Sequence, residues 1–191
     1  MKLIIGLGNP GKKYAKTRHN AGFLYMDFLQ KEFGFEPFVY DRKMSAEISG
    51  GMIGKQKMLL IKPNTFMNDS GTAVRSLLDF YKLSLADIIV VHDDLDIAPG
   101  KYRTTISSRA AGHNGVQNII DTIGTQDFFR IRLGIGRPIE VSGVCPPESV
   151  LEASRAGISA HDFVLQDFSP EELETLTKLS PKVKDDILLL V

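Results

Sequence analysis

The stretch LIIGLGNPGKKYAKTRHNAG, residues 3–22, decides between two kinds of α/β fold. Its apolar start predicts a buried strand, after which Gly6, Gly8 and Gly11 follow with the spacing G-x-G-x-x-G. That spacing marks a dinucleotide-binding turn only when the glycines open a helix that packs on the sheet. KKYAKTRHN follows instead and has no apolar face, so we expect a polar loop there and a helix that begins near residue 20.

Strand-like and helix-like segments alternate along the rest of the chain. Amphipathic spacing predicts helices over residues 20–33, from about 69 onward and over 116–123, followed by a terminal helix over 170–190. Short apolar runs predict strands at 38–48, 56–62, 87–94, 100–106 and 129–136. Because no helix separates the runs at 38–48 and 56–62, the sheet should be mixed rather than wholly parallel. We therefore predict a single globular α/β domain over residues 1–191, with a twisted mixed β-sheet flanked by helices.

A few residues are typical of the ends of these elements. Asn20 is a candidate cap for the first helix, and Gly34 is expected to end it. Gly50 and Gly51 stand between two strand-like runs and predict a hairpin turn. Pro181 lies inside the terminal helical pattern, where its missing N–H donor is expected to break the helix.

The composition argues against several classes of protein. No apolar run approaches the roughly 18 residues that indicate a membrane span, and the N-terminal apolar run is too short for a signal peptide. Cys145 is the only cysteine, so neither an internal disulfide nor a cysteine-rich zinc site can form. We expect a cytoplasmic protein with no membrane contact.

Charge is distributed unevenly although the net charge is zero. Residues 101–137 hold six Lys/Arg against two Asp/Glu, whereas residues 138–191 hold four against ten. Arginines around a glycine-containing turn suit a phosphate-bearing partner, although a cluster of charges is also typical of a plain solvated face.

Polar side chains gather in loops that follow strands or precede helices. These side chains are Asn9, Tyr14 and His19 in the first loop, Asn68 before the second helix, Asp93 at the end of the strand 87–94, and His113 with Asn114 before the third helix. Because α/β proteins build their sites at the carboxyl ends of strands, we expect several of these loops to meet at one edge of the sheet.

Four of these stretches resemble one protein family. GLGNPGKKYAKTRHNAG, KPNTFMNDSG, VHDDLDIAPG and AAGHNG occur in the order and at the spacing found in bacterial-type peptidyl-tRNA hydrolases. The resemblance covers residues 1–137 and continues more faintly in DFVLQDF, residues 162–168. It implies a monomeric α/β globule that cleaves the ester between a peptide and the 3′ ribose of tRNA, without a metal or another cofactor.

The resemblance also assigns residues to the substrate, peptidyl-tRNA. It implies that Tyr14, Met67 and Phe66 line the groove for the peptide. Arg132 and Arg103 would contact the end or the acceptor stem of the tRNA.

The residues suit ester hydrolysis on chemical grounds as well. His19 has an ordinary pKa of about 6.5 and can act as a general base near neutral pH. Asp93 is the natural partner to fix its tautomer and to stabilise the imidazolium that forms. The amides of Asn9, Asn68 and Asn114 can orient the substrate carbonyl and a water, or stabilise an oxyanion. No G-x-S-x-G motif occurs and the one cysteine has no histidine nearby in sequence, which favours attack by water over a covalent nucleophile.

Several of these residues have structural alternatives. Asn68 and Asn114 can be helix caps, and Asn9 can serve only its turn. His113 can shape its turn or contact tRNA. Arg132 and the other arginines can form structural salt bridges.

Other functions also stay open. His92, Asp94 and Asp96 beside Asp93 raise the question of a metal, but no second ligand cluster occurs at a recognisable spacing. Two rival functions stay open. The chain could be an RNA-binding protein that has this scaffold and has lost catalysis, or it could be a nucleotide-binding enzyme.

The chain departs from the family pattern at three places. SSRAA at 107–111 replaces a glycine-rich run and Thr105 stands where many relatives carry lysine, so Arg109 is a candidate for the missing phosphate-binding charge. QD at 166–167 stands where relatives tend to have glycine and a basic residue. Residues 138–160 are longer than the usual link, and we expect an insertion or lid-like segment there.

Overall fold

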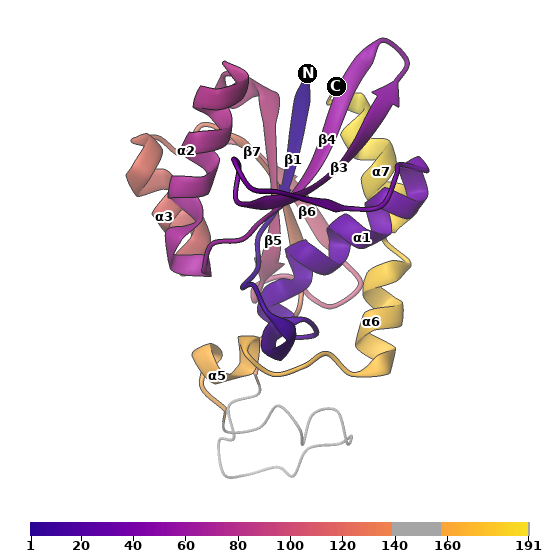
Figure 1. The fold of residues 1–191 in the computed structure, drawn as a ribbon. Coiled ribbons are helices and arrows are strands. Elements are labelled where there is room, and N and C mark those ends of the chain that lie inside the picture. Colours follow the sequence, from indigo (N-terminus) through magenta and orange to yellow (C-terminus); the bar gives the residue numbers. More distant parts are fainter. Residues whose placement is uncertain (139–157, 191) are drawn as a thin grey trace, which may run out of the picture.

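A seven-stranded β-sheet runs through the middle of the protein, with helices on both of its faces (Figure 1). The computed structural model describes residues 1–138 and 158–190. The strand order is β2-β3-β4-β1-β5-β7-β6. The strands are β1 (Lys2–Gly6), β2 (Val39–Asp41), β3 (Ala46–Ile53), β4 (Gln56–Pro63), β5 (Ile88–Asp94), β6 (Tyr102–Thr105) and β7 (Phe129–Gly134).

The centre of the sheet is parallel and its two borders are antiparallel, which confirms the predicted mixed sheet. β1 lies between β4 and β5 and is parallel to both, and β7 is parallel to β5. β2, β3 and β4 pair antiparallel in sequence order, and β6 pairs antiparallel with β7. A strand covered on both faces needs a continuous apolar run, which LIIG in β1 and IIVV in β5 supply. Since β1, β4, β5 and β7 run in one direction, their carboxyl ends lie at one edge of the sheet.

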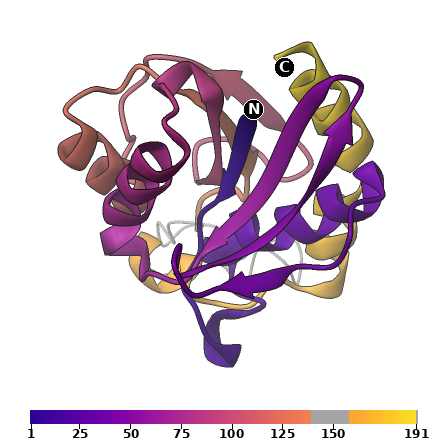
Figure 2. The ribbon, with the colours of Figure 1, turned by 45° about the horizontal axis from the view of Figure 1, so that its top comes forward.

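Helices α2 (Ser70–Tyr81) and α3 (Asn114–Ile123) cover one face of the sheet (Figures 1 and 2). Val74, Leu77 and Leu78 of α2 are buried there, as their helical spacing predicts. Helix α1 (Ala21–Phe33) covers the other face together with α6 (Pro170–Thr177) and α7 (Ser180–Leu189). The short helix α5 (Ala160–Val164) lies at the edge where the central parallel strands end (Figure 1).

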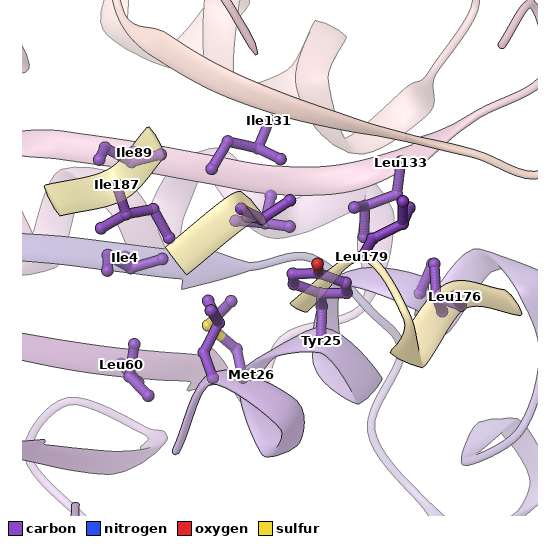
Figure 3. Close-up of a cluster of buried hydrophobic side chains, with 14 of the residues drawn as sticks. Ile4, Tyr25, Met26, Leu60, Ile89, Ile131, Leu133, Leu176, Leu179 and Ile187 are labelled. Atoms are coloured by element: carbon purple, nitrogen blue, oxygen red, sulfur yellow. The ribbon is translucent and has the colours of Figure 1, made fainter. Parts of the chain in front are cut away.

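The C-terminal helices are part of the main core on the face that α1 covers (Figure 3). Tyr25 and Met26 of α1 belong to the same buried cluster as Ile4 of β1, and Leu176 and Ile187 join it from α6 and α7. Each of these side chains is buried, and full burial of an aliphatic side chain contributes about 1.5–3 kcal/mol. The C-terminal segment is therefore held to the sheet by packing and not only by polar contacts.

The hairpin turn between β3 and β4 differs from the prediction. It lies at Gly54, whose φ is 59°, whereas Gly50 and Gly51 lie inside β3. A Cβ atom on Gly51 would be 2.7 Å from the ring of Phe35. These two glycines let neighbouring groups approach the strand closely, so the prediction of a turn there is wrong.

The terminal helix breaks a few residues before the predicted point. α6 ends at Thr177 and α7 begins at Ser180, so that Pro181 lies in the first turn of α7. The backbone N–H groups of a first turn have no partner within the helix, and proline is therefore tolerated there.

Two further sequence predictions can be placed. Within the described part of the chain, none of the helices has both the length and the apolar character that crossing a membrane would require. Most of the segment 138–160, including Cys145, lies outside the described residues.

Candidate active site

A cavity of about 560 Å³ lies at the carboxyl ends of the central strands, where the loops after β1, β4 and β5 meet the N-terminus of α3. Eight residues that the sequence singles out line it: Asn9, Tyr14, His19, Met67, Asn68, Asp93, His113 and Asn114. The prediction that these loops gather at one edge of the sheet is confirmed. Residues of α5 and the neighbouring Leu165 complete the wall.

His19 and Asp93 form a buried pair at the base of this cavity. Asp93 stands near the end of β5, and His19 lies in a short 3-10 turn directly before α1. The Nδ1 atom of His19 is 3.0 Å from Oδ2 and 3.1 Å from Oδ1 of Asp93. Burial lowers the pKa of His19, but the charge of Asp93 and its hydrogen bond outweigh this effect and raise the pKa above its ordinary value.

His113 holds the same carboxylate from the other side. Its Nε2 atom is 3.0 Å from Oδ1 of Asp93, and its Nδ1 atom accepts a hydrogen bond from the backbone N–H of Val116. Because Nδ1 accepts this bond, the ring proton must lie on Nε2, which donates to Asp93. Burial raises the pKa of Asp93, but the two imidazoles more than offset this and hold the pKa well below its usual value.

The two contacts fix the protonation state of the group that faces the cavity. With Asp93 ionised, Nδ1 of His19 carries the proton that it donates to the carboxylate. Its Nε2 atom then carries a lone pair, and it makes no hydrogen bond with any of the residues that the structure describes. His19 can therefore accept a proton from a molecule bound in the cavity.

Asn9 is held by the chain around it. The side chain of Asn20 bonds both the backbone N–H and the carbonyl of Asn9, at 2.8 and 2.9 Å. The side-chain oxygen of Asn9 accepts a hydrogen bond of 2.8 Å from the backbone N–H of Met67. Its amide N–H₂ group remains as the donor for a ligand. Asn20, which the sequence suggested as a helix cap, makes no capping hydrogen bond and instead braces Asn9.

We call these five buried residues the floor of the site: His19, Asp93, His113, Asn9 and Asn20. Its rim consists of Asn68, Asn114 and the loop residues Ala111 and Gly112. Asn68 and Asn114 are exposed to the cavity, and within the described residues their amides make no hydrogen bond. Asn114 is the first residue of α3, and the cap is His113, so the alternative role of Asn114 as a helix cap is not observed.

The chain matches the family model described as "Peptidyl-tRNA hydrolase" over residues 3–191. A peptidyl-tRNA hydrolase of Exiguobacterium sibiricum is 45% identical over 176 residues, which cover 92% of this chain and 85% of that protein. One from Desulfitobacterium hafniense is 42% identical over 182 residues, covering 95% and 88%. The chain belongs to the peptidyl-tRNA hydrolase family.

Solved structures of peptidyl-tRNA hydrolases agree with this fold. The crystal structure of peptidyl-tRNA hydrolase from Acinetobacter baumannii superposes with a TM-score of 0.81 at 32% sequence identity. The match covers 100% of this chain and 88% of that one.

The arginines that the resemblance to peptidyl-tRNA hydrolases singled out lie outside the cavity lining. Arg132 pairs with Asp94, with 2.6 Å between Nε and Oδ2, so the alternative of a structural salt bridge is observed for it. Arg103 lies opposite Arg132 in the β6–β7 pairing and is exposed, as is Arg109. Phe66 is 56% exposed and stands next to Met67, which lines the cavity. Substrate contacts of these residues stay predictions.

The acidic cluster at the end of β5 has structural partners. Asp94 pairs with Arg132, and Asp96 accepts a hydrogen bond of 2.7 Å from Nε of Arg137. His92 is buried, with its Nδ1 atom 2.7 Å from the carbonyl of Asp93, and burial, together with the nearby His113, puts its pKa well below the usual value.

A metal ion could also be considered at the floor. The nitrogen and oxygen atoms of His19, Asp93 and His113 lie within 4.8 Å of one another, which is a spacing that can hold a cation. The proton positions derived above already account for each contact as a hydrogen bond. Independence of metals stays an expectation.

Two buried arginines have structural roles that the sequence did not indicate. Arg130, on β7, donates to Ser108 and to the carbonyl of Arg109, and so holds the loop in which Ser107 and Ala111 have positive φ values. Arg18 precedes His19 and contacts the C-terminal segment. The sequence gives no pattern that separates these two from solvated arginines, because their partners lie far away along the chain.

Proposed function

We propose that this chain hydrolyses the ester bond between a peptide, or an N-blocked aminoacyl group, and the 3′ ribose of tRNA, with His19 as the general base. This reaction recycles tRNA from peptidyl-tRNA that has been released prematurely. Membership of the family supports the substrate. The observation that carries the mechanism is the His19–Asp93 pair, whose free imidazole nitrogen belongs to a residue that lines the cavity.

The base acts on a water molecule. Nε2 of His19 takes a proton from the water as its oxygen attacks the ester carbonyl, which forms a tetrahedral intermediate with a negatively charged oxygen. Asp93 stabilises the imidazolium, and His113 keeps the carboxylate in place. When the intermediate collapses, the imidazolium returns the proton to the leaving 3′ oxygen. The products are a free peptide carboxylic acid and tRNA with an intact 3′ hydroxyl.

The asparagine amides supply the remaining polar contacts. The N–H₂ group of Asn9 is held in one orientation by its neighbours and can donate to a substrate carbonyl. The exposed amides of Asn68 and Asn114 stand at the opening, where they can bind the water, the oxyanion or the ribose. Fixed donors at a developing oxyanion typically contribute about 10²–10³ in rate.

The walls of the cavity suit a peptide of varied sequence. Met67 and Leu95 present apolar surface, Tyr14 adds an aromatic ring, and Val164 of α5 contributes the other side. Met67 is 4% exposed and fills the space beside Gly115, where a Cβ atom would be 2.5 Å from its sulfur. On the tRNA side, the exposed Arg103 and Arg109 and the paired Arg132 supply positive charge for phosphates.

One assay tests the proposal. N-acetylaminoacyl-tRNA is incubated with the protein, and the release of free tRNA is followed. Wild type is expected to turn over, whereas His19→Ala should lose about 10³ or more in kcat and keep its fold and its tRNA affinity. A chelator should leave the rate of wild type unchanged.

Three results would change the conclusion. Wild type that binds tRNA and releases nothing would support the RNA-binding protein without catalysis. Equal turnover by His19→Ala and wild type would remove the assignment of the base. Loss of wild-type activity in the chelator, with recovery on adding a metal ion, would place a cation at the floor.

A further inference from the structure

Arg18, the residue before His19, is buried and points its charge toward the C-terminal part of the chain. The residue is 5% exposed, and its Nη2 atom forms an ion pair of 2.8 Å with Oε2 of Glu172. Its guanidinium lies 4.3 Å from the centre of the ring of Phe163, and Nη1 is 3.4 Å from both the carbonyl of Phe163 and Oε1 of Gln166. One side chain thus holds three parts of the segment that follows residue 158.

The backbones of the two segments are joined as well. The N–H of Arg18 donates to the carbonyl of Gln166, and the N–H of Phe168 donates to the carbonyl of Lys16, both at 2.9 Å. Thr17 and Asp167 form an antiparallel bridge between these bonds. Residues 16–18 and 166–168 therefore act as a small two-stranded connection that ends at the proposed base. We call this connection, with the side chains of Arg18, Phe163 and Glu172, the clamp.

The segment that the clamp holds forms one wall of the cavity. His161, Val164 and Leu165 line the cavity from α5 and the residue after it, opposite the loops of the sheet. α5 has only five residues, which is too short for a helix to be stable by itself. Its position therefore depends on the buried Phe163, on which Arg18 packs, and on the backbone bonds of the clamp.

Glu172 links the clamp to α6. Its carboxylate accepts the backbone N–H of Ser169 in a capping box at the start of α6, and it pairs with Arg18 through the same oxygen. The side chains of Arg18 and Glu172 are only 6% and 7% exposed, so their ion pair is buried, and breaking it is expected to cost more than breaking an exposed pair. Arg18 is adjacent to His19 in the chain and contacts Phe163 of α5, so its contacts link the position of α5 to that of His19.

We propose that Arg18 is a positioning residue for the hydrolysis reaction: through Glu172 and Phe163 it fixes the α5 wall relative to His19 and so sets how tightly the cavity binds the peptidyl group. The inference rests on the function proposed above. The floor is held separately by Asp93 and His113, so a loosened clamp should weaken substrate binding more than the proton-transfer step.

The test uses Arg18→Lys and Glu172→Gln in the full chain, with steady-state hydrolysis of N-acetylaminoacyl-tRNA and of a peptidyl-tRNA that carries a longer peptide. Each variant is expected to raise KM by about tenfold or more for both substrates, with kcat changed by less than about threefold. The pH profile of kcat should match that of wild type, because the pair of His19 and Asp93 is intact. Folding is checked by circular dichroism below the unfolding midpoint.

Glu32→Gln is the control. Glu32 also ties the C-terminal segment to the rest of the protein, through Lys184 on α7 at 3.8 Å, but it lies away from the cavity. This variant should keep the KM of wild type even where its melting temperature falls, which separates positioning of the wall from general stability.

Two results would overturn the proposal, and a third would refute the function on which it rests. A KM within twofold of wild type in the folded clamp variants would overturn the proposal, as would a fall in kcat at an unchanged KM. If Arg18→Lys does not fold, Glu172→Gln and Phe163→Leu carry the same expectation. A wild-type protein that hydrolyses neither substrate would instead refute the proposed function.

Discussion

The floor and the rim of the site differ in burial and in hydrogen bonding. In the floor, His19, Asp93 and His113 are buried, and the carboxylate is bonded from two sides. In the rim, Asn68 and Asn114 are exposed and their amides have no partner among the described residues. Proton transfer requires groups held in one geometry, whereas a substrate can be bound only by donors that nothing else occupies. Changes in the floor should therefore damage both stability and chemistry, and changes to the two rim asparagines should damage chemistry alone.

The largest effect is expected for Asp93→Asn. Both neighbouring imidazoles donate to Asp93, and an amide can accept from one of them but would present its own N–H₂ group to the other. The base then loses its tautomer and the stabilisation of its imidazolium, so kcat should fall by about 10³ or more. Single-turnover hydrolysis measures this loss. Asp96→Asn is the control, because it removes an acid that lies just after β5 and outside the floor and that pairs with Arg137. A loss below tenfold for Asp93→Asn would contradict the floor as described.

Asn114→Ala in the rim and Asn9→Ala in the floor make the same substitution in the two regions and can be compared directly. Asn114→Ala should lower kcat/KM by about 10–100-fold with an unchanged melting temperature, because its exposed amide has no partner among the described residues and is proposed to contact the substrate. Asn9→Ala should lower the activity too, but it also leaves the buried N–H of Met67 without its acceptor and should cost about 1–2 kcal/mol of unfolding free energy. Thermal or denaturant unfolding of both variants checks the difference. Equal losses of unfolding free energy in the two variants would contradict the proposed difference between floor and rim.

The pH dependence of the reaction reports on the floor. The proposed base, His19, must be neutral to act, and its pKa is raised above the ordinary value of 6.5, so kcat/KM should rise with pH and reach half of its maximum above pH 6.5. Asp93→Asn removes the causes that raise the pKa and leaves burial, so the midpoint of its residual activity should move to lower pH. A wild-type midpoint at or below pH 6.5 would mean that Asp93 does not hold the imidazolium.

The smallest effect is expected in the rim loop. Ala111 has a φ of 50°, a left-handed conformation in which a Cβ atom is unfavourable. Ala111→Gly should therefore raise the free energy of unfolding by about 0.5–1 kcal/mol. Denaturant titration is the measurement, and Ala73→Gly inside α2 should lower stability instead. A destabilised Ala111→Gly protein would show that the loop is not strained.

The sequence predicted the parts of the fold and site that depend on local patterns. The apolar runs of β1 and β5, the helical stripe of Val74 and its neighbours, and the gathering of polar loops at one edge all follow from periodicity and strand direction. The pairing of His19 with Asp93 was predicted from chemistry, and the structure places the two in contact.

What the sequence could not predict depends on contacts between distant residues. Gly50 and Gly51 look like a turn until Phe35 is seen to pack against the strand. His113 is not a typical N-cap residue, so its double role as cap and as partner of Asp93 had no local signal. Arg18 meets Glu172 across more than 150 positions of the chain, and no spacing rule links them.

The place of β1 in the sheet has a consequence for how the protein is made. Its two neighbours are β4 and β5, so β1 cannot be paired on both sides until residue 94 has been synthesised. The clamp needs residue 172 as well. The loop that carries His19 is therefore translated well before the elements that fix it, and a nascent chain that stalls in between would carry the proposed base without the structure that positions it.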